Sequence, residues 1–180
     1  MTMAEHGQRI VTAKELLILR AFVPTDKELT ASLKFNPVGR IDALQLGFGE
    51  TCTNGSCRAQ FCAPGVCLHS HPFSNRISSA DAAVCMQRST ISPDSCSLIL
   101  TPLGVFTYRA SPEHVAEWRV MSSDAKRSKR QQWQFIGLAL QAATQRGEMD
   151  VFINKMASNG IQVSYVPWAE VERGGGVLAL

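Results

Sequence analysis

Several features that define large classes of proteins are missing from this chain of 180 residues. No stretch approaches the 18 or more consecutive apolar residues of a membrane-spanning helix, so we expect no membrane association. Residues 1–9 lack the apolar centre of a secretory signal, which favours an intracellular protein in the cytoplasm or the nucleus. The net charge of +3 is small, and it gives no reason to expect nucleic acid as a partner. There is no internal repeat.

The chain also lacks the Cys-x-x-Cys spacing of most structural zinc sites, although it has six cysteines. Four of them are evenly spaced, with four residues between each pair: Cys52, Cys57, Cys62 and Cys67. Three interpretations fit this spacing, namely a second metal site, one or two disulfides, or reduced thiols that pack as small hydrophobic groups. A reducing compartment favours reduced thiols.

The composition and the hydrophobic periodicity predict one α/β protein in which helices flank a mixed sheet. Hydrophobic residues make up 45% of the chain and charged residues 18%, which suits a globular core. Short apolar or alternating runs predict strands over residues 9–11, 28–35, 40–48, 65–68, 96–101, 104–109 and 161–166. Helices are predicted over residues 13–22, 79–87, 124–145 and 150–158. Residues 49–65 are rich in Gly, Cys, Ser and Asn and predict a long loop or an irregular hairpin.

Two histidines stand at the end of a predicted buried strand. On a strand, residues i and i+2 point to the same face, so His69 and His71 are expected to lie side by side. Pro72 ends the strand because it has no N–H to donate. Ser78 is a good helix N-cap, and Asp81 falls in the first turn of the helix that follows. Two imidazoles and one carboxylate are a ligand set that leaves a Zn²⁺ ion one position for a water molecule, which it activates as a nucleophile.

The same residues also fit structural roles. Ser78 followed by Asp81 is close to a helix capping box, and an acid in the first turn is favoured by the helix dipole. A single histidine is likewise more often a hydrogen-bonded structural residue than a metal ligand. However, two of the four histidines share one strand face just before a capped helix, and this combination favours a metal site.

The string His69-Ser70-His71-Pro72 with Ser78 and Asp81 resembles the signature of the JAMM (MPN-plus) zinc metalloproteases. The family has six residues between the proline and the serine, and this chain has five, Phe73–Ile77. The predicted element order over residues 9–109 also resembles the MPN fold, a cytidine-deaminase-like mixed sheet flanked by helices. The resemblance implies a zinc-dependent hydrolase of amide or isopeptide bonds. Its substrate would be a protein or peptide conjugate, including conjugates of ubiquitin-like proteins.

The resemblance also implies a role for each site residue. His69, His71 and Asp81 would hold Zn²⁺, and Ser78 would donate a hydrogen bond to the tetrahedral oxyanion. The family places a catalytic glutamate where the first helix gives way to the next strand, and Glu28 occupies that point. Glu28 would then act as general base and afterwards as general acid. Glu50 is the competing candidate, within the turn-rich segment.

Two other functions were weighed against this one. Many MPN-fold proteins are non-catalytic scaffolds of large assemblies, and the shortened loop, the cysteine-rich segment and the C-terminal extension would suit such a subunit. An amidohydrolase built on a His-x-His strand is excluded by length, because that barrel needs ~250 residues. The basic run Lys126–Arg130 suggests nuclear targeting or nucleic-acid binding, but no aromatic platform for bases adjoins it, so a solvated helix face is favoured.

The expected domain organisation follows from these patterns. Residues 9–120 are predicted to form the MPN-like domain, and residues 121–170 to add helices and a last strand that pack on it. Residues 171–180 contain Gly174-Gly175-Gly176 and predict a flexible tail.

Overall fold

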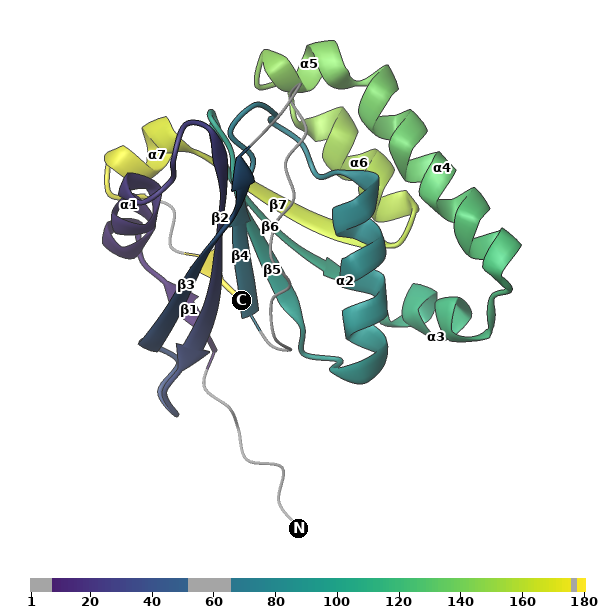
Figure 1. Cartoon of the computed structure of the whole chain (residues 1–180), viewed down its shortest axis with the longest axis horizontal. Helices are drawn as coiled ribbons and strands as arrows, with labels where there is room; N and C mark the ends of the chain where they lie inside the picture. Colours follow the sequence, from purple (N-terminus) through teal and green to yellow (C-terminus); the bar gives the residue numbers. More distant parts are fainter. Residues whose placement is uncertain (1–7, 52–65, 176–177) are drawn as a thin grey trace.

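The computed structural model describes residues 8–51, 66–175 and 178–180, and these parts form a mixed α/β fold around one twisted sheet (Figure 1). The six strands of this sheet lie side by side in the order β3 (Ile41–Thr51), β2 (Lys27–Phe35), β4 (Val66–Ser70), β5 (Cys96–Leu100), β6 (Gly104–Ala110) and β7 (Ile161–Pro167). Only β4 and β5 run parallel, and the other neighbours are antiparallel. The predicted α/β class with a mixed sheet is therefore confirmed.

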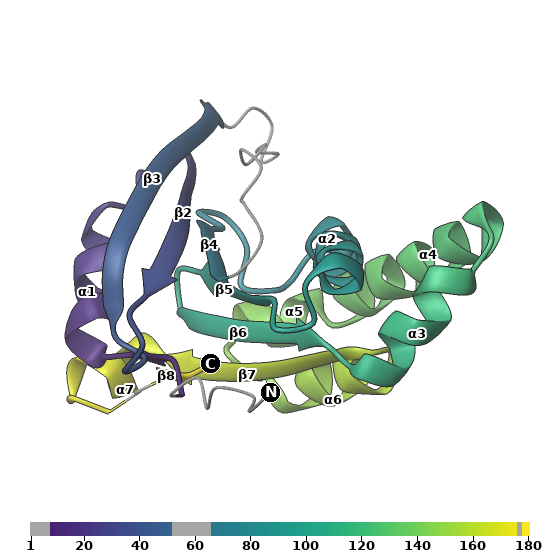
Figure 2. The same ribbon diagram turned by 90° about the horizontal axis from the view of Figure 1, so that it is seen from below.

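Helices cover both faces of the sheet, as the two views in Figures 1 and 2 show. On one face lie α1 (Ala13–Ala21), α7 (Trp168–Glu172) and a small sheet of β1 (Ile10–Val11) and β8 (Leu178–Ala179). The other face carries α2 (Ser79–Ile91), α3 (Pro112–Val120), α4 (Ser123–Ala139) and α6 (Asp150–Ser158), with the short α5 (Gln141–Gln145) beside them. No helix in the described parts is long and apolar enough to cross a membrane.

Each face of the sheet has its own hydrophobic core. The core under α1 and α7 includes Leu16, Leu29, Leu68, Leu98 and Trp168. The core under α2, α4 and α6 includes Met86, Ile99, Phe106, Trp133 and Phe152. Because side chains alternate along a strand, a residue next to Leu29 or Leu68 in sequence points to the α2 side. This alternation places Glu28 and His69 on the same side of the sheet as α2.

Side-chain caps define where the main helices begin. Thr12 and Glu15 form a full capping box at α1, and Ser78 and Asp81 form a second one at α2. At α3, Ser111 caps the helix and Pro112 takes the first helical position, where its missing N–H costs no hydrogen bond. The sequence predicted two of these N-caps, Thr12 for α1 and Ser78 for α2, and both predictions are confirmed.

Several boundaries differ from the sequence-based prediction, and α2, for example, extends to Ile91 and not only to Gln87. The return strand does not end at residue 48 but continues to Thr51, because pairing with β2 goes on past a register shift as far as Lys27. For residues 49–65 a long loop or an irregular hairpin was predicted; residues 49–51 continue the strand, and the remainder lies outside the described part. The predicted helix 124–145 is two helices, because the backbone of Leu140 (φ −106°, ψ 10°) leaves the helical region between α4 and α5.

Secondary structure occupies part of residues 171–180, the segment that was predicted to be a flexible tail. Helix α7 extends to Glu172, and β8 pairs with β1 through Leu178 opposite Val11. Gly174 has a φ of 82°, a conformation that glycine adopts without strain, so the chain can turn after α7. The physical reason for the order is burial, since only 5% of Leu178 is exposed in the core under α1.

If this C-terminal strand is part of the core, Leu178→Ala should lower the free energy of unfolding by about 2 kcal/mol, as loss of a buried leucine side chain does. The matched control is Leu138→Ala, because 56% of Leu138 is exposed. The control should change stability by less than about 0.5 kcal/mol. Urea denaturation measures both, and equal effects of the two substitutions would show that the C-terminal segment contributes nothing to the core.

Candidate metal centre

The two histidines extend from the middle of the sheet. Strand β4 lies between β2 and β5, with His69 opposite Thr30 on one side and Ile99 on the other. His71 follows the end of β4, yet its backbone N–H still donates to the carbonyl of Leu100 over 2.8 Å. Both histidine backbones are therefore fixed by hydrogen bonds to neighbouring strands, and the spacing i, i+2 brings their rings together as predicted from the sequence.

Three ligand atoms converge at this point. The Nε2 atoms of His69 and His71 lie 3.0 Å apart. Asp81 approaches from the start of α2, with Oδ1 3.0 Å from Nε2 of His69 and Oδ2 3.2 Å from Nε2 of His71. The three side chains are between 10% and 14% exposed. This is the group among the described residues whose histidine, cysteine or acidic side chains can hold a metal ion.

A hydrogen bond on the side of the His71 ring away from Asp81 determines the tautomer of the ring. Nδ1 of His71 lies 2.9 Å from the backbone carbonyl of Arg76. Since a carbonyl only accepts, Nδ1 carries the hydrogen, and a neutral ring then has its lone pair on Nε2. Histidines that bind metals are typically oriented in this way by a carbonyl or a carboxylate behind them.

These residues fit a tetrahedral zinc site. With Zn–N and Zn–O bonds of about 2.0–2.1 Å, two ligand atoms of a tetrahedral site are separated by about 3.3 Å. The two Nε2 atoms lie 3.0 Å apart and Oδ1 of Asp81 lies 3.0 Å from Nε2 of His69, both close to this value, while the 3.2 Å contact with His71 is made by the other oxygen, Oδ2. A carboxylate and a lone pair on Nε2 of His71 repel each other at such distances, so the arrangement requires a cation or a shared proton between them. The donor set therefore matches a metal ion, whose identity the geometry alone does not fix.

The electrostatics of the triad agree with this requirement. Burial alone would raise the pKa of Asp81, but the neighbouring His71 and His69 and their hydrogen bonds lower the pKa well below its usual value. Burial would lower the pKa of His71, but the charge of Asp81, its hydrogen bond and the charge of Glu28 raise the pKa instead. The site thus stabilises a negative carboxylate together with a positive charge beside it.

Asp81 is held by the capping box of α2. Its Oδ2 accepts hydrogen bonds from the hydroxyl of Ser78 over 2.6 Å and from the backbone N–H of Ser78 over 2.8 Å. In return, the N–H of Asp81 donates to the Ser78 hydroxyl oxygen over 3.1 Å. The structural interpretation of Ser78 and Asp81 as a capping box is therefore confirmed, and the same cap orients the carboxylate that faces the histidines.

Glu28 lies near this triad. It is 8% exposed on β2, one residue from Leu29, whose N–H donates to the buried hydroxyl of Ser70 over 2.8 Å. Burial raises the pKa of Glu28, while the charges of His71 and His69 lower it and the charge of Asp81 raises it. The structure thus brings His69, His71, Ser78 and Asp81 into contact with one another, and it places Glu28 within electrostatic range of the triad. The side chain of the competing Glu50 lies outside the described part, although its backbone belongs to β3.

The loop between His71 and Ser78 is anchored at three points. Asn75 accepts from the N–H of Leu103 over 3.1 Å and donates to Gln145 in α5 over 3.0 Å. The guanidinium of Arg76 donates to the carbonyl of Gly137 in α4. Ile77 is buried in the core under α2. The loop is therefore held by the C-terminal helices, although it is one residue shorter than in the family that it resembles.

Sequence reasoning missed the supporting residues Ser70, Asn75 and Arg76. Asn75 and Arg76 lie in the loop between the motif residues, and their partners Gln145 and Gly137 are 70 and 61 residues away in the chain. The partner of Ser70 is 41 residues away. Such contacts leave no periodic pattern in a sequence. The only local signal was the position of these residues between the two halves of the motif.

Of the cysteines that suggested a second metal site, three lie outside the described part: Cys52, Cys57 and Cys62. Cys67 is buried in β4, two residues before His69. A cleft of about 420 Å³ opens beside His71 and is lined on its other sides by Arg20, Phe73 and Trp168, among others. This cleft provides a neighbouring space in which a ligand or a substrate can lie.

Comparisons with known proteins add no family to these findings. No model of a known protein family matches the chain, and no curated protein matches it. The case for a function therefore depends on the residues and their geometry.

If the triad is a metal centre, the purified protein should contain one equivalent of metal, and His69→Ala, His71→Ala and Asp81→Ala should each lower its affinity by more than about 100-fold. Elemental analysis identifies the metal, and titration with a chelator measures the affinity. His114→Ala is the matched control, because His114 contacts Ser111 in α3 and takes no part in the triad. Metal-free wild-type protein, purified without chelator, would contradict the assignment.

Proposed function

We propose that this protein is a zinc-dependent hydrolase of amide or isopeptide bonds, of the JAMM type on an MPN-like fold. The observation that carries this proposal is the convergence of the His69, His71 and Asp81 ligand atoms within 3.2 Å contacts at the end of β4. A second acid, Glu28, lies close enough to affect the same histidines electrostatically. A metal site that serves only structure is normally closed by a fourth protein ligand, and these three leave a position open.

Zinc bound by this triad would supply a Lewis acid for the scissile carbonyl and a water molecule of lowered pKa. Glu28 accepts the proton of the attacking water and returns it to the departing amine. Its burial suits this task, because a carboxylate that is poorly solvated holds a proton more readily than an exposed one. Asp81 keeps the site anionic and is prevented from rotating by the Ser78 hydroxyl.

A thiol-dependent mechanism has less support from the described cysteines. Burial raises the pKa of Cys85 to about 12 and also raises the pKa of Cys96. Neither group provides a thiolate near neutral pH, and the thiolate is the nucleophilic form. The proposal therefore uses a water nucleophile.

The second candidate is a non-catalytic scaffold, and the C-terminal helices favour it in one respect. They form an apolar groove on the side of α4 that faces α6, and no residue of the metal centre lines it. Such a groove is typical of proteins that bind other proteins. A scaffold needs no general base, so the two candidates differ in what Glu28 does.

Glu28→Gln tests the catalytic proposal. Glutamine keeps the shape and the hydrogen bonds but cannot accept the proton, so kcat should fall by about 10²–10⁴-fold while the protein keeps its metal. The assay is cleavage of a panel of ubiquitin-type isopeptide and peptide conjugates by the zinc-loaded protein. Glu50→Gln in parallel should behave like the wild type.

The outcomes of this assay separate the alternatives. An inactive Glu50→Gln beside an active Glu28→Gln would show that the general base lies at the end of β3. If the zinc-loaded wild type cleaves nothing in the panel, the scaffold becomes the better description. Stoichiometric iron in place of zinc would redirect the proposal to oxygen chemistry, for which two histidines and one carboxylate are also a known ligand set.

Ser78 has two proposed roles that one substitution distinguishes. Its hydroxyl hydrogen is donated to Asp81, so we propose that Ser78 positions the metal ligand. Ser78→Ala should then weaken zinc binding by about 10- to 100-fold and lower stability by about 1 kcal/mol through loss of the cap. Ser78→Thr retains the hydroxyl and should restore both. An oxyanion role would instead lower kcat by about 10²–10³-fold with zinc affinity unchanged.

A further inference from the structure

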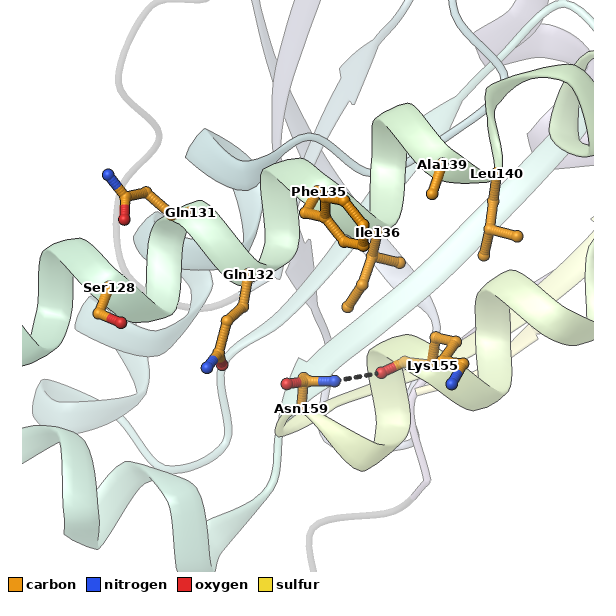
Figure 3. Close-up of a pocket in the computed structure, with 9 residues that line it drawn as sticks. All are labelled: Ser128, Gln131, Gln132, Phe135, Ile136, Ala139, Leu140, Lys155 and Asn159. Carbon is orange, nitrogen blue, oxygen red and sulfur yellow. Dashed lines mark hydrogen bonds between the residues drawn. The ribbon is translucent and has the colours of Figure 1, made fainter.

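A groove runs along the surface between α4 and α6, and none of its lining residues belongs to the metal centre. Its volume is about 520 Å³, and its lining comes from both helices: Ser128, Gln131, Gln132, Phe135, Ile136, Ala139 and Leu140 of α4, and Lys155 and Asn159 of α6 and its C-cap. Ile136 and Leu140 point from α4 toward α6 (Figure 3). From Ser128 to Ala139 the groove extends about 16 Å, since a helix rises 1.5 Å per residue.

The floor and walls of this groove are rigid. Trp133 is buried below it and donates to the carbonyl of Asn159 over 3.1 Å, which ties α4 to the end of α6. Asn159 in turn donates to the carbonyl of Lys155 over 2.9 Å, as Figure 3 shows. A site whose walls are fixed before a ligand arrives loses less entropy on binding than a flexible one.

Large apolar side chains gather at the groove and lie exposed. Phe135 is 71% exposed in its wall, and Leu138 follows one turn later on α4 at 56%. Val151 is 54% exposed on α6, one turn before the lining residue Lys155. Of these three side chains Phe135 lines the groove, and Leu138 and Val151 extend the exposed apolar surface of α4 and α6 next to it.

Lysines lie in and beside the groove, although Glu117 acts on Lys129 and Asp124 pairs with Arg127. Lys155 is in its lining, and Lys129 donates to Asn159 at its edge over 3.3 Å. Arg127 and Arg130 are exposed on the same half of α4, where Asp124 is the acidic residue. The lining contains no carboxylate. Lys129 is therefore the cation at the polar end of the groove, and Lys155 lies nearer its apolar end, below Ala139 and Leu140 (Figure 3).

We propose that this groove binds an amphipathic helix of about three turns from a partner protein, with apolar anchors along one face and acidic residues beside them. A third helix packs naturally in the groove between two antiparallel helices, with anchors at positions i, i+3 or i+4, and i+7. The apolar anchors contact Phe135, Ile136 and Leu140. The acidic residues lie beside Lys155 and Lys129.

A second copy of the chain fits less well. Packing α4 against α4 of another copy would bring two basic segments together, each with four cations between Lys126 and Arg130. Like charges at an interface oppose association. The groove is accordingly matched to a partner of opposite charge.

The experiment is a selection from a display library of helical peptides of about 14 residues, a length that spans the groove. The wild-type protein is the target, and Phe135→Asp is the counter-target. Enriched peptides should combine apolar residues at helical spacing with Asp or Glu beside them. Fluorescence anisotropy should then show binding at least about tenfold weaker to Phe135→Asp and to Lys155→Glu.

Ile91→Asp is the matched control, because Ile91 is 73% exposed on α2 and has no part in the groove. It should bind the peptides as the wild type does, and all three variants should unfold at the temperature of the wild type. Absence of enrichment, peptides without acidic residues, or equal binding to Phe135→Asp would each overturn the proposal. A dimer in sedimentation that Phe135→Asp dissociates would assign the groove to a second copy, and binding of an oligonucleotide that competes with the peptides would assign it to nucleic acid.

Discussion

The central constraint on this structure is the close approach of one carboxylate and two imidazoles that are largely buried. The carboxylate oxygens of Asp81 lie 3.0 and 3.2 Å from the Nε2 atoms of His69 and His71, and these two Nε2 atoms lie 3.0 Å from each other. Buried acceptors at such distances are unfavourable unless a proton or a metal ion lies between them. The sheet supplies the rigidity that this arrangement needs, because β4 is hydrogen-bonded on both sides, to β2 and to β5.

The start of α2 supplies the remaining constraint. The capping box fixes Asp81 relative to Ser78, and burial of Ala82 and Met86 fixes the helix on the sheet. The position of the carboxylate is therefore set by the helix and not by the number of residues in the preceding loop. This explains how a loop of five residues, anchored through Asn75 and Arg76, accommodates a motif that resembles one with six.

The parts of this architecture that could be predicted are those with a local physical signal. Caps and periodicity gave α1, β2, β4 and α2, and the i, i+2 spacing of His69 and His71 gave the core of the site. The order of residues 178–180 could not be predicted, because the three glycines before them suggest mobility, while the burial of Leu178 depends on β1 at the other end of the chain. The contacts of Asn75 with Gln145 and of Arg76 with Gly137 were likewise invisible, since these partners lie 70 and 61 residues away.

Arg76 joins the C-terminal helices to the metal centre through two hydrogen bonds, one in which it donates and one in which it accepts. Its guanidinium donates to the carbonyl of Gly137, and its own carbonyl accepts from Nδ1 of His71. A side chain at position 137 would begin 3.4 Å from the guanidinium, so the absence of one permits this close approach. Ile136, the neighbour of Gly137, lines the groove toward α6. Helix α4 thus forms one wall of the groove with Ile136, and through Gly137 and Arg76 it also supports His71. The groove and the metal centre therefore lie on different sides of α4.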